Sequence, residues 1–507
     1  MIVTNMIPYI GEMNGHKTLF VDGKPFIILG LQWDCDGCYT KADMDPLFAE
    51  CEKMGLNTAS LLLYWNEIEP REGEYHFEML DHRIKMARKH HMKIILVWFA
   101  TFKNSVMTYA PDYVRQDHKR FAKVWDKNGM HITNSSCPKA VETHQRDEAA
   151  LVQVFKHLGE VDSEEHTVIL FQMENETGIY LSDRCYCDNC NEAFIKGNYG
   201  IRYGVHAAES FTAECVLEYC DSLAKIAKEI YPLPIYMNAA LSMVISNVRP
   251  GLESFSGGPD IKVLDIYLDK MKYIDFISPD IYQYSYRDFH YYCKEYSKKR
   301  NPLFVAECAT GKGTRTEKNV FYAVGEYGAI GFDPWSVTRS FPNFMSEPLI
   351  TLSNLQWSNE AYELQKSYKL ISTAIQPIAR AQHTDNLKVF VQEEGEEGSL
   401  LNFSDVDVEI RYASSNTAAR GMVIRHSKNE FIILAMGVFV QFTKDGGERV
   451  SVSRIESGYF KDDNWICNFV YASERMPNSP FSIADGRAVK IILGERIDKP
   501  DLEAGLR

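Results

Sequence analysis

Two glutamates, each at the end of an apolar run, are the side chains best placed to do chemistry. Glu176 closes the stretch "TVILFQMENE", and Glu307 closes "PLFVAE". A carboxylate at the end of a buried strand is costly unless it is paired or used. Two such groups facing each other suit glycoside cleavage, in which one is a protonated acid for the leaving oxygen and the other an ionised nucleophile. That reaction requires no metal and no organic cofactor.

Three cysteines form a second cluster with chemical meaning. Cys185, Cys187 and Cys190 stand in "RCYCDNC", a C-x-C-x2-C array. Three thiolates this close can share one tetrahedral Zn²⁺, which needs a fourth ligand from elsewhere. Cys137 in "NSSCPKAVETH" is the first candidate and His144 the second. Because the protein would fill all four ligand positions, we expect a structural Zn²⁺ and not a catalytic one.

The elements that must position these residues alternate between short apolar runs and amphipathic stretches. Runs such as "FIILGLQW", "NTASLLLYW", "KIILVWFA", "HTVILFQMENE" and "PLFVAECAT" predict strands, and stretches such as "EMLDHRIKMARKHHM" predict the helices between them. Buried strands without polar alternation indicate a parallel sheet covered by helices. Seven or eight strand–helix units in about 350 residues fit a closed barrel better than an open sheet. We therefore predict an α/β fold, with a (β/α)8 TIM barrel over residues 1–375 that includes a short N-terminal strand segment.

The character of the chain changes from about Gln376 onward. Runs such as "LKVFVQ", "GMVIRH" and "AVKIILG" alternate in strand fashion between turns rich in Gly, Asp and Asn, and no long helical pattern follows. Short strands between such turns are typical of antiparallel sheets. The pattern predicts a smaller all-β, sandwich-like domain over residues 376–507.

Polar and aromatic residues gather where the predicted barrel strands end. In a TIM barrel these ends form one face, and barrel enzymes carry their sites there. A side chain on that face can bind a sugar hydroxyl, stack on a sugar ring, or simply pack at the rim. The residues that we select on this basis as candidate substrate contacts are Trp65, Trp98, Lys103, Asn104, Tyr282 and Trp335.

Several segments resemble two families of barrel glycosidases. "QMENETG" resembles the "QxENExG" strand end of glycoside hydrolase family 35 β-galactosidases. Segments between residues 19 and 340, from "LFVDGKPFIILG" to "YAVGEYGAIGF", are similar to barrel segments of the family 35 and family 42 β-galactosidases. The cysteine stretch "CYCDNCNEAF", with the earlier "SSCP", resembles the metal cluster of family 42. The chain thus looks like a retaining glycosidase that combines features of both families.

The resemblance implies a role for each residue of the motif. Glu176 would be the general acid/base, Glu307 the nucleophile and Asn175 the contact to the sugar 2-hydroxyl. Glu174 would be non-catalytic, with a structural role such as pairing with a cation inside the barrel. The implied activity is that of a retaining β-galactosidase, which hydrolyses terminal β-D-galactosides by double displacement. A homo-oligomer is also implied, since family 42 enzymes commonly form trimers.

Other functions remain open. Another retaining β-glycosidase, such as a β-glucosidase, an arabinopyranosidase or a galactanase, would use the same two carboxyl groups. A non-catalytic sugar-binding barrel would be expected to lack one of the two glutamates, and both are present. A catalytic zinc would need an open coordination position and an H-x-E type base, which the sequence does not show. Cys35 and Cys38 form a C-x2-C pair, for which a second metal or redox site is an alternative to plain thiols.

Composition limits the partners of the chain. Its 507 residues include 55 Lys and Arg against 69 Asp and Glu, which gives a formal charge of −14. That balance argues against nucleic acid or an anionic membrane, since both need clustered basic residues. The sequence shows no signal-peptide pattern and no apolar run long enough to span a bilayer. We therefore expect a soluble, cytoplasmic protein. The resemblance, and not the composition, implies that its substrate is a small or oligomeric galactoside.

Overall fold

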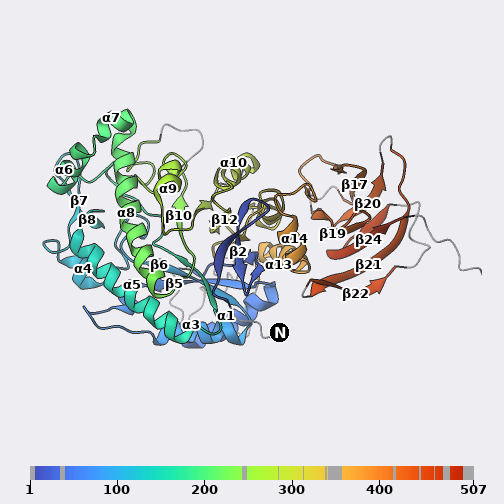
Figure 1. Ribbon diagram of the computed structural model, residues 1–507, viewed down its shortest axis with the longest axis horizontal. Helices are drawn as coiled ribbons and strands as arrows, with labels where there is room; N and C mark the ends of the chain where they lie inside the picture. The colour runs from blue at the N-terminus through green and yellow to red at the C-terminus, as the bar shows by residue number, and fades with distance from the viewer. Residues whose placement is uncertain are drawn as a thin grey trace, which may run out of the picture. The chain divides into compact units, whose positions relative to one another are not determined.

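The computed structural model divides into two compact units, each described here by itself (Figure 1). The first comprises Met1–Thr314 and Ala329–Ala361, and the second Arg315–Gly328 and Tyr362–Arg507. The domain boundary expected between residues 375 and 376 stays a prediction, because compact units defined by contacts need not be domains that fold alone. The residues that the structure describes are 6–34, 40–242, 248–283, 285–311, 313–336, 340, 357–414, 418–444, 447–461, 463–471 and 480–494.

The first unit is built on a ring of parallel strands. Neighbours in the ring pair in parallel, and Gln32 closes it by bridging to Ser60 on one side and to Trp335 on the other. Only Ala306 separates β12 from β13, so these two short strands occupy one position of the ring. The described residues therefore form the eight-position barrel that the sequence predicts. The strands in ring order are β4 (Ile28–Leu29), β5 (Thr58–Tyr64), β6 (Lys93–Phe99), β9 (Val168–Gln172), β10 (Ile235–Ala240), β11 (Phe276–Ile281), β12 (Phe304–Val305) with β13 (Glu307–Cys308), and β14 (Gly331–Phe332).

Helices follow most of these strands along the chain and pack around the ring (Figure 1). The first begins with a capping box between Thr40 and Asp43 and ends at Gly55, whose φ of 84° is in the left-handed region. Its buried face, which includes Leu47 and Phe48, lies toward the barrel. Strand β6 is buried at six of its seven positions, as expected for a strand covered on both faces. The helices of this unit include α1 (Lys41–Met54), α3 (Glu78–Lys89), α5 (Val141–Val161), α8 (Ala207–Ile230), α9 (Leu264–Lys270) and α10 (Tyr286–Tyr296), and shorter ones are α2 (Trp65–Ile68) and α4 (Asp112–Gln116).

An N-terminal antiparallel meander contributes to the core of the barrel. It consists of β1 (Tyr9–Met13), β2 (His16–Val21) and β3 (Lys24–Pro25). Leu19 and Val21 of β2 are buried in one hydrophobic cluster with residues of the barrel strands. Among the described helices of both units, none has the length and apolar composition required to cross a bilayer.

The second unit is dominated by two antiparallel sheets, as the sequence predicts. Val408 and Val440 of one sheet share a buried core with Ile433 and Val489 of the other, which is the arrangement of a β-sandwich. Helices α11 (Thr316–Phe321), α13 (Asn359–Ser372) and α14 (Ile375–Ala381) precede the strands of the two sheets along the chain. The six-stranded sheet is formed by β15 (Leu387–Val391), β18 (Arg420–Arg425), β19 (Glu430–Met436), β24 (Arg487–Leu493), β21 (Val452–Lys461) and β22 (Asn464–Val470), and the four-stranded sheet by β16 (Gly398–Phe403), β17 (Val406–Tyr412), β20 (Val438–Thr443) and β23 (Phe481–Ile483).

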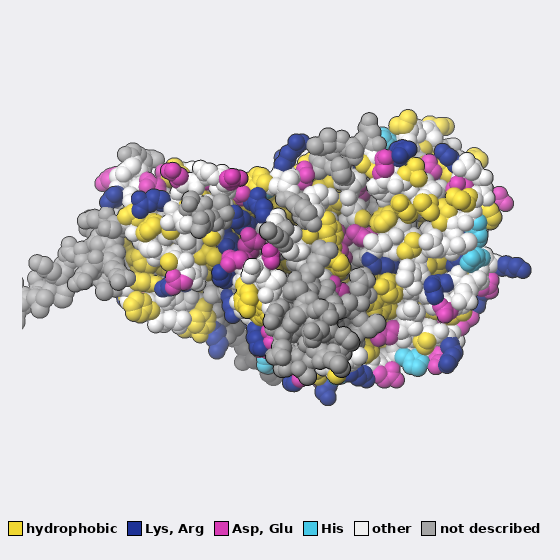
Figure 2. Space-filling view, turned by 180° about the vertical axis from the view of Figure 1, so that it is seen from behind, with side chains coloured by type: hydrophobic (Ala, Val, Ile, Leu, Met, Phe, Trp, Pro, Cys, Tyr) yellow, Lys and Arg dark blue, Asp and Glu magenta, His cyan; other side chains and the backbone are white. Residues whose placement is uncertain are grey.

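Charged side chains of both signs are distributed over the surface. On the face shown in Figure 2, Lys and Arg are interspersed with Asp and Glu and with apolar side chains. Local pairing of opposite charges is frequent, for example between Arg120 and Glu72 at 2.7 Å. Such exposed pairs contribute little to stability.

Candidate active site

Glu176 and Glu307 meet in one pocket of the barrel. Glu176 follows the end of β9 by four residues, and Glu307 begins β13. One carboxylate oxygen from each of these residues and one from Asp280 all lie within 4.8 Å of one another. The pocket has a volume of about 220 Å³ and is lined by Gln32, Leu62, Phe99, Lys103, Asn104, Glu176, Tyr282, Glu307 and Trp335.

Glu307 is held by three hydrogen-bond donors. Gln32 Nε2 and Asn175 Nδ2 donate to its Oε1 at 2.9 and 3.2 Å. The Tyr282 hydroxyl donates to its Oε2 at 2.6 Å. Donors that converge on a carboxylate favour its ionised form. Glu307 is thus arranged as a charged group, which is the state that a nucleophile requires.

Glu176 lies in a contrasting environment. Its backbone N–H donates to Asn238 Oδ1 at 2.8 Å, and the Asn104 side-chain amide donates to its Oε2. Burial and the neighbouring charge of Glu307 raise the pKa of Glu176 to about 7, although Lys103 acts in the opposite direction. A carboxyl group with such a pKa can hold a proton near neutral pH and then release it, which suits a general acid/base.

The backbone around these glutamates departs from a regular strand. Both Glu174 and Glu176 adopt positive φ, at 62° and 46°. A non-glycine residue keeps this conformation only where the surroundings fix it, and such residues cluster at functional sites. Gly178 follows with φ at 133°, and a Cβ there would lie 2.8 Å from Ser256 O. The turn therefore requires glycine at this position.

Three residues of the site were not selected from the sequence. Asp280 ends the parallel strand beside Glu307, and Asn238 Nδ2 donates to its Oδ2 at 2.6 Å. Burial and the charges of Glu307 and Glu176 raise the pKa of Asp280 well above its ordinary value. Gln32 and Asn238 complete the set. Each stands at or near the end of a predicted strand, so selecting every polar side chain at the strand ends would have identified them.

Two of the predicted sugar contacts are wrong. Trp65 and Trp98 are both 0 % exposed, and neither lines the pocket. The Trp65 indole donates to Glu69 Oε2 at 2.9 Å, and the Trp98 indole donates to Asp147 Oδ1 at 2.9 Å. Both rings are packed inside the protein, where a sugar cannot stack on them.

The other predicted contacts lie at or next to the pocket. Lys103, Asn104, Tyr282 and Trp335 line it. Asn175 is 1 % exposed, and its Nδ2 donates to Glu307 Oε1. Their contacts with a sugar stay predictions.

Among the described residues, no cation pairs with Glu174, contrary to expectation. Its two oxygens accept backbone hydrogen bonds from Thr101 N at 3.0 Å and Phe102 N at 2.8 Å. Its charged neighbour is Asp147, which is also acidic. The side chain is therefore a structural support of a different kind from the one expected.

The four cysteines predicted to bind a metal come together. Their sulfurs lie within 4.8 Å of one another, and Cys137 Sγ is 3.8 Å from Cys187 Sγ and 3.5 Å from Cys190 Sγ. None of the four is in a disulfide. His144 stands apart, with its Nε2 2.7 Å from Ser222 Oγ. The cluster, which includes Cys185, could hold a metal ion, whereas Cys35 and Cys38 lie outside the described residues.

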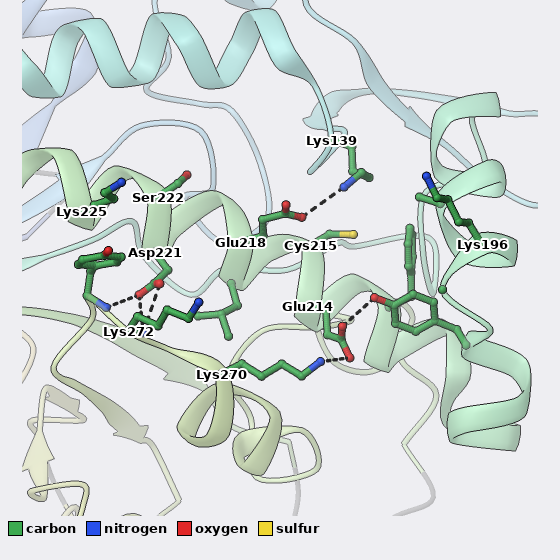
Figure 3. A pocket seen from close by; sticks show the side chains of 16 residues that line it. Lys139, Lys196, Glu214, Cys215, Glu218, Asp221, Ser222, Lys225, Lys270 and Lys272 are labelled. Atoms are coloured by element: carbon green, nitrogen blue, oxygen red, sulfur yellow. Dashed lines mark hydrogen bonds and ion pairs between the residues drawn. The ribbon is translucent and has the colours of Figure 1, made fainter.

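A larger pocket, of about 610 Å³, lies along α8 and α9 and does not include either glutamate of the site (Figure 3). Its acidic side chains are already engaged. Lys139 pairs with Glu218 at 3.3 Å and Lys270 with Glu214 at 2.6 Å. The carboxyl chemistry described above therefore belongs to the smaller pocket.

Comparison with known proteins agrees with this geometry. Residues 39–206 match the glycoside hydrolase family 42 model, described as "Beta-galactosidase". The matched range includes Glu176 and the four cysteines, and Glu307 lies beyond it. Residues 364–471 match a second family model, described as "Domain of unknown function (DUF5597)". As the sequence predicts, the chain resembles family 42 glycoside hydrolases with a TIM-barrel catalytic domain.

The similar proteins are distant ones. The β-galactosidase LacZ of Lactobacillus acidophilus is 27% identical over 162 residues, which are 31% of this chain and 22% of that protein. The chain thus matches less than a quarter of that relative's length. A β-galactosidase structure from Bacillus circulans sp. alkalophilus has a TM-score of 0.52 at 17% identity, over 69% of this chain and 56% of the other. A Marinomonas β-galactosidase structure has a TM-score of 0.51 at 13% identity, over 68% and 59%. At these identities the structures show a shared fold.

Proposed function

We propose that the chain is a retaining β-galactosidase, with Glu176 as general acid/base and Glu307 as nucleophile. The observation that carries the proposal is the unlike environment of two carboxyl groups, one oxygen of each lying within 4.8 Å of the other. Three donors favour the charged form of Glu307, whereas burial and the charge of Glu307 favour the protonated form of Glu176. Divergent environments of this kind assign acid and nucleophile roles to paired carboxyls.

The reaction follows from these protonation states. An oxygen of Glu307 attacks the anomeric carbon while the bond to the leaving oxygen breaks, and Glu176 gives its proton to that oxygen. Glu176, now ionised, takes a proton from water as the water oxygen attacks the same carbon and releases Glu307. The short separation of the carboxyl groups supports this route, since inverting enzymes keep theirs about 6.5–9.5 Å apart to admit a water.

The sugar is proposed to be galactose because the matched family model and the similar proteins are described as β-galactosidases. Asn175 is proposed to meet the 2-hydroxyl, and Lys103, Asn104, Tyr282 and Trp335 the rest of the ring. A screen of aryl β-glycosides with different sugars tests the assignment. We expect the highest kcat/KM with the galactoside. A preference for another sugar would change the proposed substrate but not the proposed roles of the two carboxyl groups.

We also propose that the four cysteines bind one structural Zn²⁺. Ligand sulfurs at about 2.3 Å in a tetrahedron lie about 3.8 Å from one another. The separations of Cys137 Sγ from Cys187 Sγ and Cys190 Sγ, 3.8 and 3.5 Å, fit that geometry. With four protein sulfurs in place, no coordination position is left for a substrate.

Assembly and location are further proposals. A homo-oligomer is supported by three exposed apolar side chains of α6 (Asp188–Lys196), α7 (Tyr199–Tyr203) and the following turn. Ile195, Ile201 and Val205 are 73, 87 and 95 % exposed, and a subunit interface would cover them.

A cytoplasmic location is supported by the free thiols of the described cysteines, since oxidising compartments favour disulfides.

A further inference from the structure

A buried network of side chains lies between the barrel and helices α5 and α8. Its centre is Asp147 of α5, which is 0 % exposed. Asp147 Oδ1 accepts a hydrogen bond from Trp98 Nε1 at 2.9 Å. Its Oδ2 accepts from the hydroxyls of Thr101 and Tyr219, both at 2.8 Å. Three donors on one carboxylate stabilise its ionised form.

Glu174 adds a second carboxyl group to this network. It is 0 % exposed, and Asp147 is its charged neighbour. Burial and the charge of Asp147 raise the pKa of Glu174 well above its ordinary value. A raised pKa favours the protonated form of Glu174.

Glu174 also holds the segment that leads to the acid/base. The backbone N–H groups of Thr101 and Phe102 donate to its two oxygens at 3.0 and 2.8 Å. Two residues farther on, the Asn104 side chain donates to Glu176. Asn104 has a φ of 52°, a conformation that a non-glycine residue keeps where its surroundings fix it.

We propose that Glu174 and Asp147 are a positioning pair that fixes residues 101–104 so that Asn104 stays on Glu176. The inference rests on the proposed function of Glu176. Glu174 does not line the pocket, so it acts on the reaction through Asn104 and not by touching substrate. Both glutamates of "QMENETG" then serve acid/base catalysis, one directly and one through this segment.

A double-mutant cycle in the full-length protein tests the proposal. Glu174→Ala and Asn104→Ala are each expected to lower kcat on an aryl β-galactoside about 10²-fold, which is the usual cost of misplacing a catalytic group by about 1 Å. If Glu174 acts through Asn104, the double variant is no slower than the slower single variant. Losses that multiply would overturn the proposal.

The pH profile separates positioning from a general loss of stability. The Asn104 amide favours the ionised form of Glu176, so its displacement raises the pKa of Glu176. We therefore expect the alkaline limb of kcat/KM to move to higher pH in Glu174→Ala. Glu174→Gln keeps one acceptor oxygen for the Thr101 and Phe102 N–H groups and loses the other, so its shift should be smaller than that of Glu174→Ala. An unmoved limb in Glu174→Ala, or an equal shift in Glu174→Gln, would contradict the proposal.

Glu209→Gln is the matched control. Glu209 is a buried glutamate of α8, 5 % exposed, whose pKa burial raises to about 7, and it takes no part in the network. This variant is expected to keep the kcat and pH profile of the unmodified protein. If Glu174→Ala does not fold, Tyr219→Phe takes its place in the double-mutant cycle with Asn104→Ala, because Tyr219→Phe removes one donor to Asp147.

Amide hydrogen exchange gives a readout that needs no activity. Exchange at Thr101 and Phe102 should be faster in Glu174→Ala and unchanged in Glu209→Gln, and unchanged exchange in Glu174→Ala would overturn the proposal. Near-normal hydrolysis by Glu176→Ala would instead refute the proposed function. The exchange result would then still decide whether Glu174 holds the segment.

Discussion

Tyr282, which directly follows β11, is joined to Glu307 of the adjacent strand β13 by a 2.6 Å hydrogen bond from its hydroxyl to Glu307 Oε2. Hydrogen bonds to a charged group are stronger than those between neutral groups. The contact therefore fixes the orientation of the carboxylate in the pocket. Tyr282 thus makes a polar contact there in addition to presenting its aromatic ring.

Tyr282→Phe should lower kcat about 10- to 100-fold, because it removes one hydrogen bond to a charged group, worth about 1.5–3 kcal/mol. Steady-state kinetics on an aryl β-galactoside measure the effect. Tyr296→Phe is the control, since it removes a buried tyrosine hydrogen bond of 2.8 Å, to Pro259 O, outside the pocket. Equal losses in the two variants would show that the Tyr282 contact has no special role.

The coupling between the two glutamates predicts a pH effect with a definite sign. The charge of Glu307 is one of the causes that raise the pKa of Glu176 to about 7, so the alkaline limb of kcat/KM should fall near pH 7. Glu307→Gln removes that charge and should lower the pKa of Glu176. Because this variant is expected to be inactive, carboxyl ¹³C NMR titration is the measurement. A pKa that stays the same or rises would refute the coupling.

The barrel was predictable because its strands are buried on both faces and so appear as apolar runs. The same property hides which side chains point inward. Side chains alternate along a strand, so Phe99 lines the pocket while the adjacent Trp98 faces α5. An apolar run gives no sign of which set faces the substrate, and the wrong prediction for Trp98 follows from that.

Glu174 shows a second limit of the sequence. Glu174 and Glu176 differ by two positions, and an alternating strand would place both on one side. Positive φ at both residues breaks the alternation, so one carboxyl group faces the pocket and the other meets Asp147. Asp147 comes from α5, and its approach depends on helix packing that local sequence does not reveal.

Retention of configuration is expected from the separation of the carboxyl groups. Proton NMR of the first product of β-galactoside hydrolysis should show the β anomer before mutarotation. Glu307→Gly supplied with azide and an activated β-galactoside should form the α-galactosyl azide, because azide attacks from the side that the nucleophile leaves open. An initial α-configured sugar from the unmodified protein would refute double displacement.

Removal of the metal should destabilise the protein without removing a catalytic group. The cysteine cluster belongs to a buried region that includes Cys137, Cys185 and Cys190 together with Phe211 of α8, so loss of Zn²⁺ would leave thiols packed without their common ligand. We expect about one Zn²⁺ per chain by elemental analysis. Chelation or Cys187→Ser should lower Tm, and the protein that stays folded should keep most of its kcat.

Cys467→Ser is the control for the metal experiment, because Cys467 is an exposed cysteine of β22, outside the cluster. It should change neither the zinc content nor Tm. Native protein without zinc would refute the four-cysteine site. Loss of kcat in proportion to zinc in protein that stays folded would show that the metal takes part in the reaction, since a purely structural ion acts only on the folded fraction.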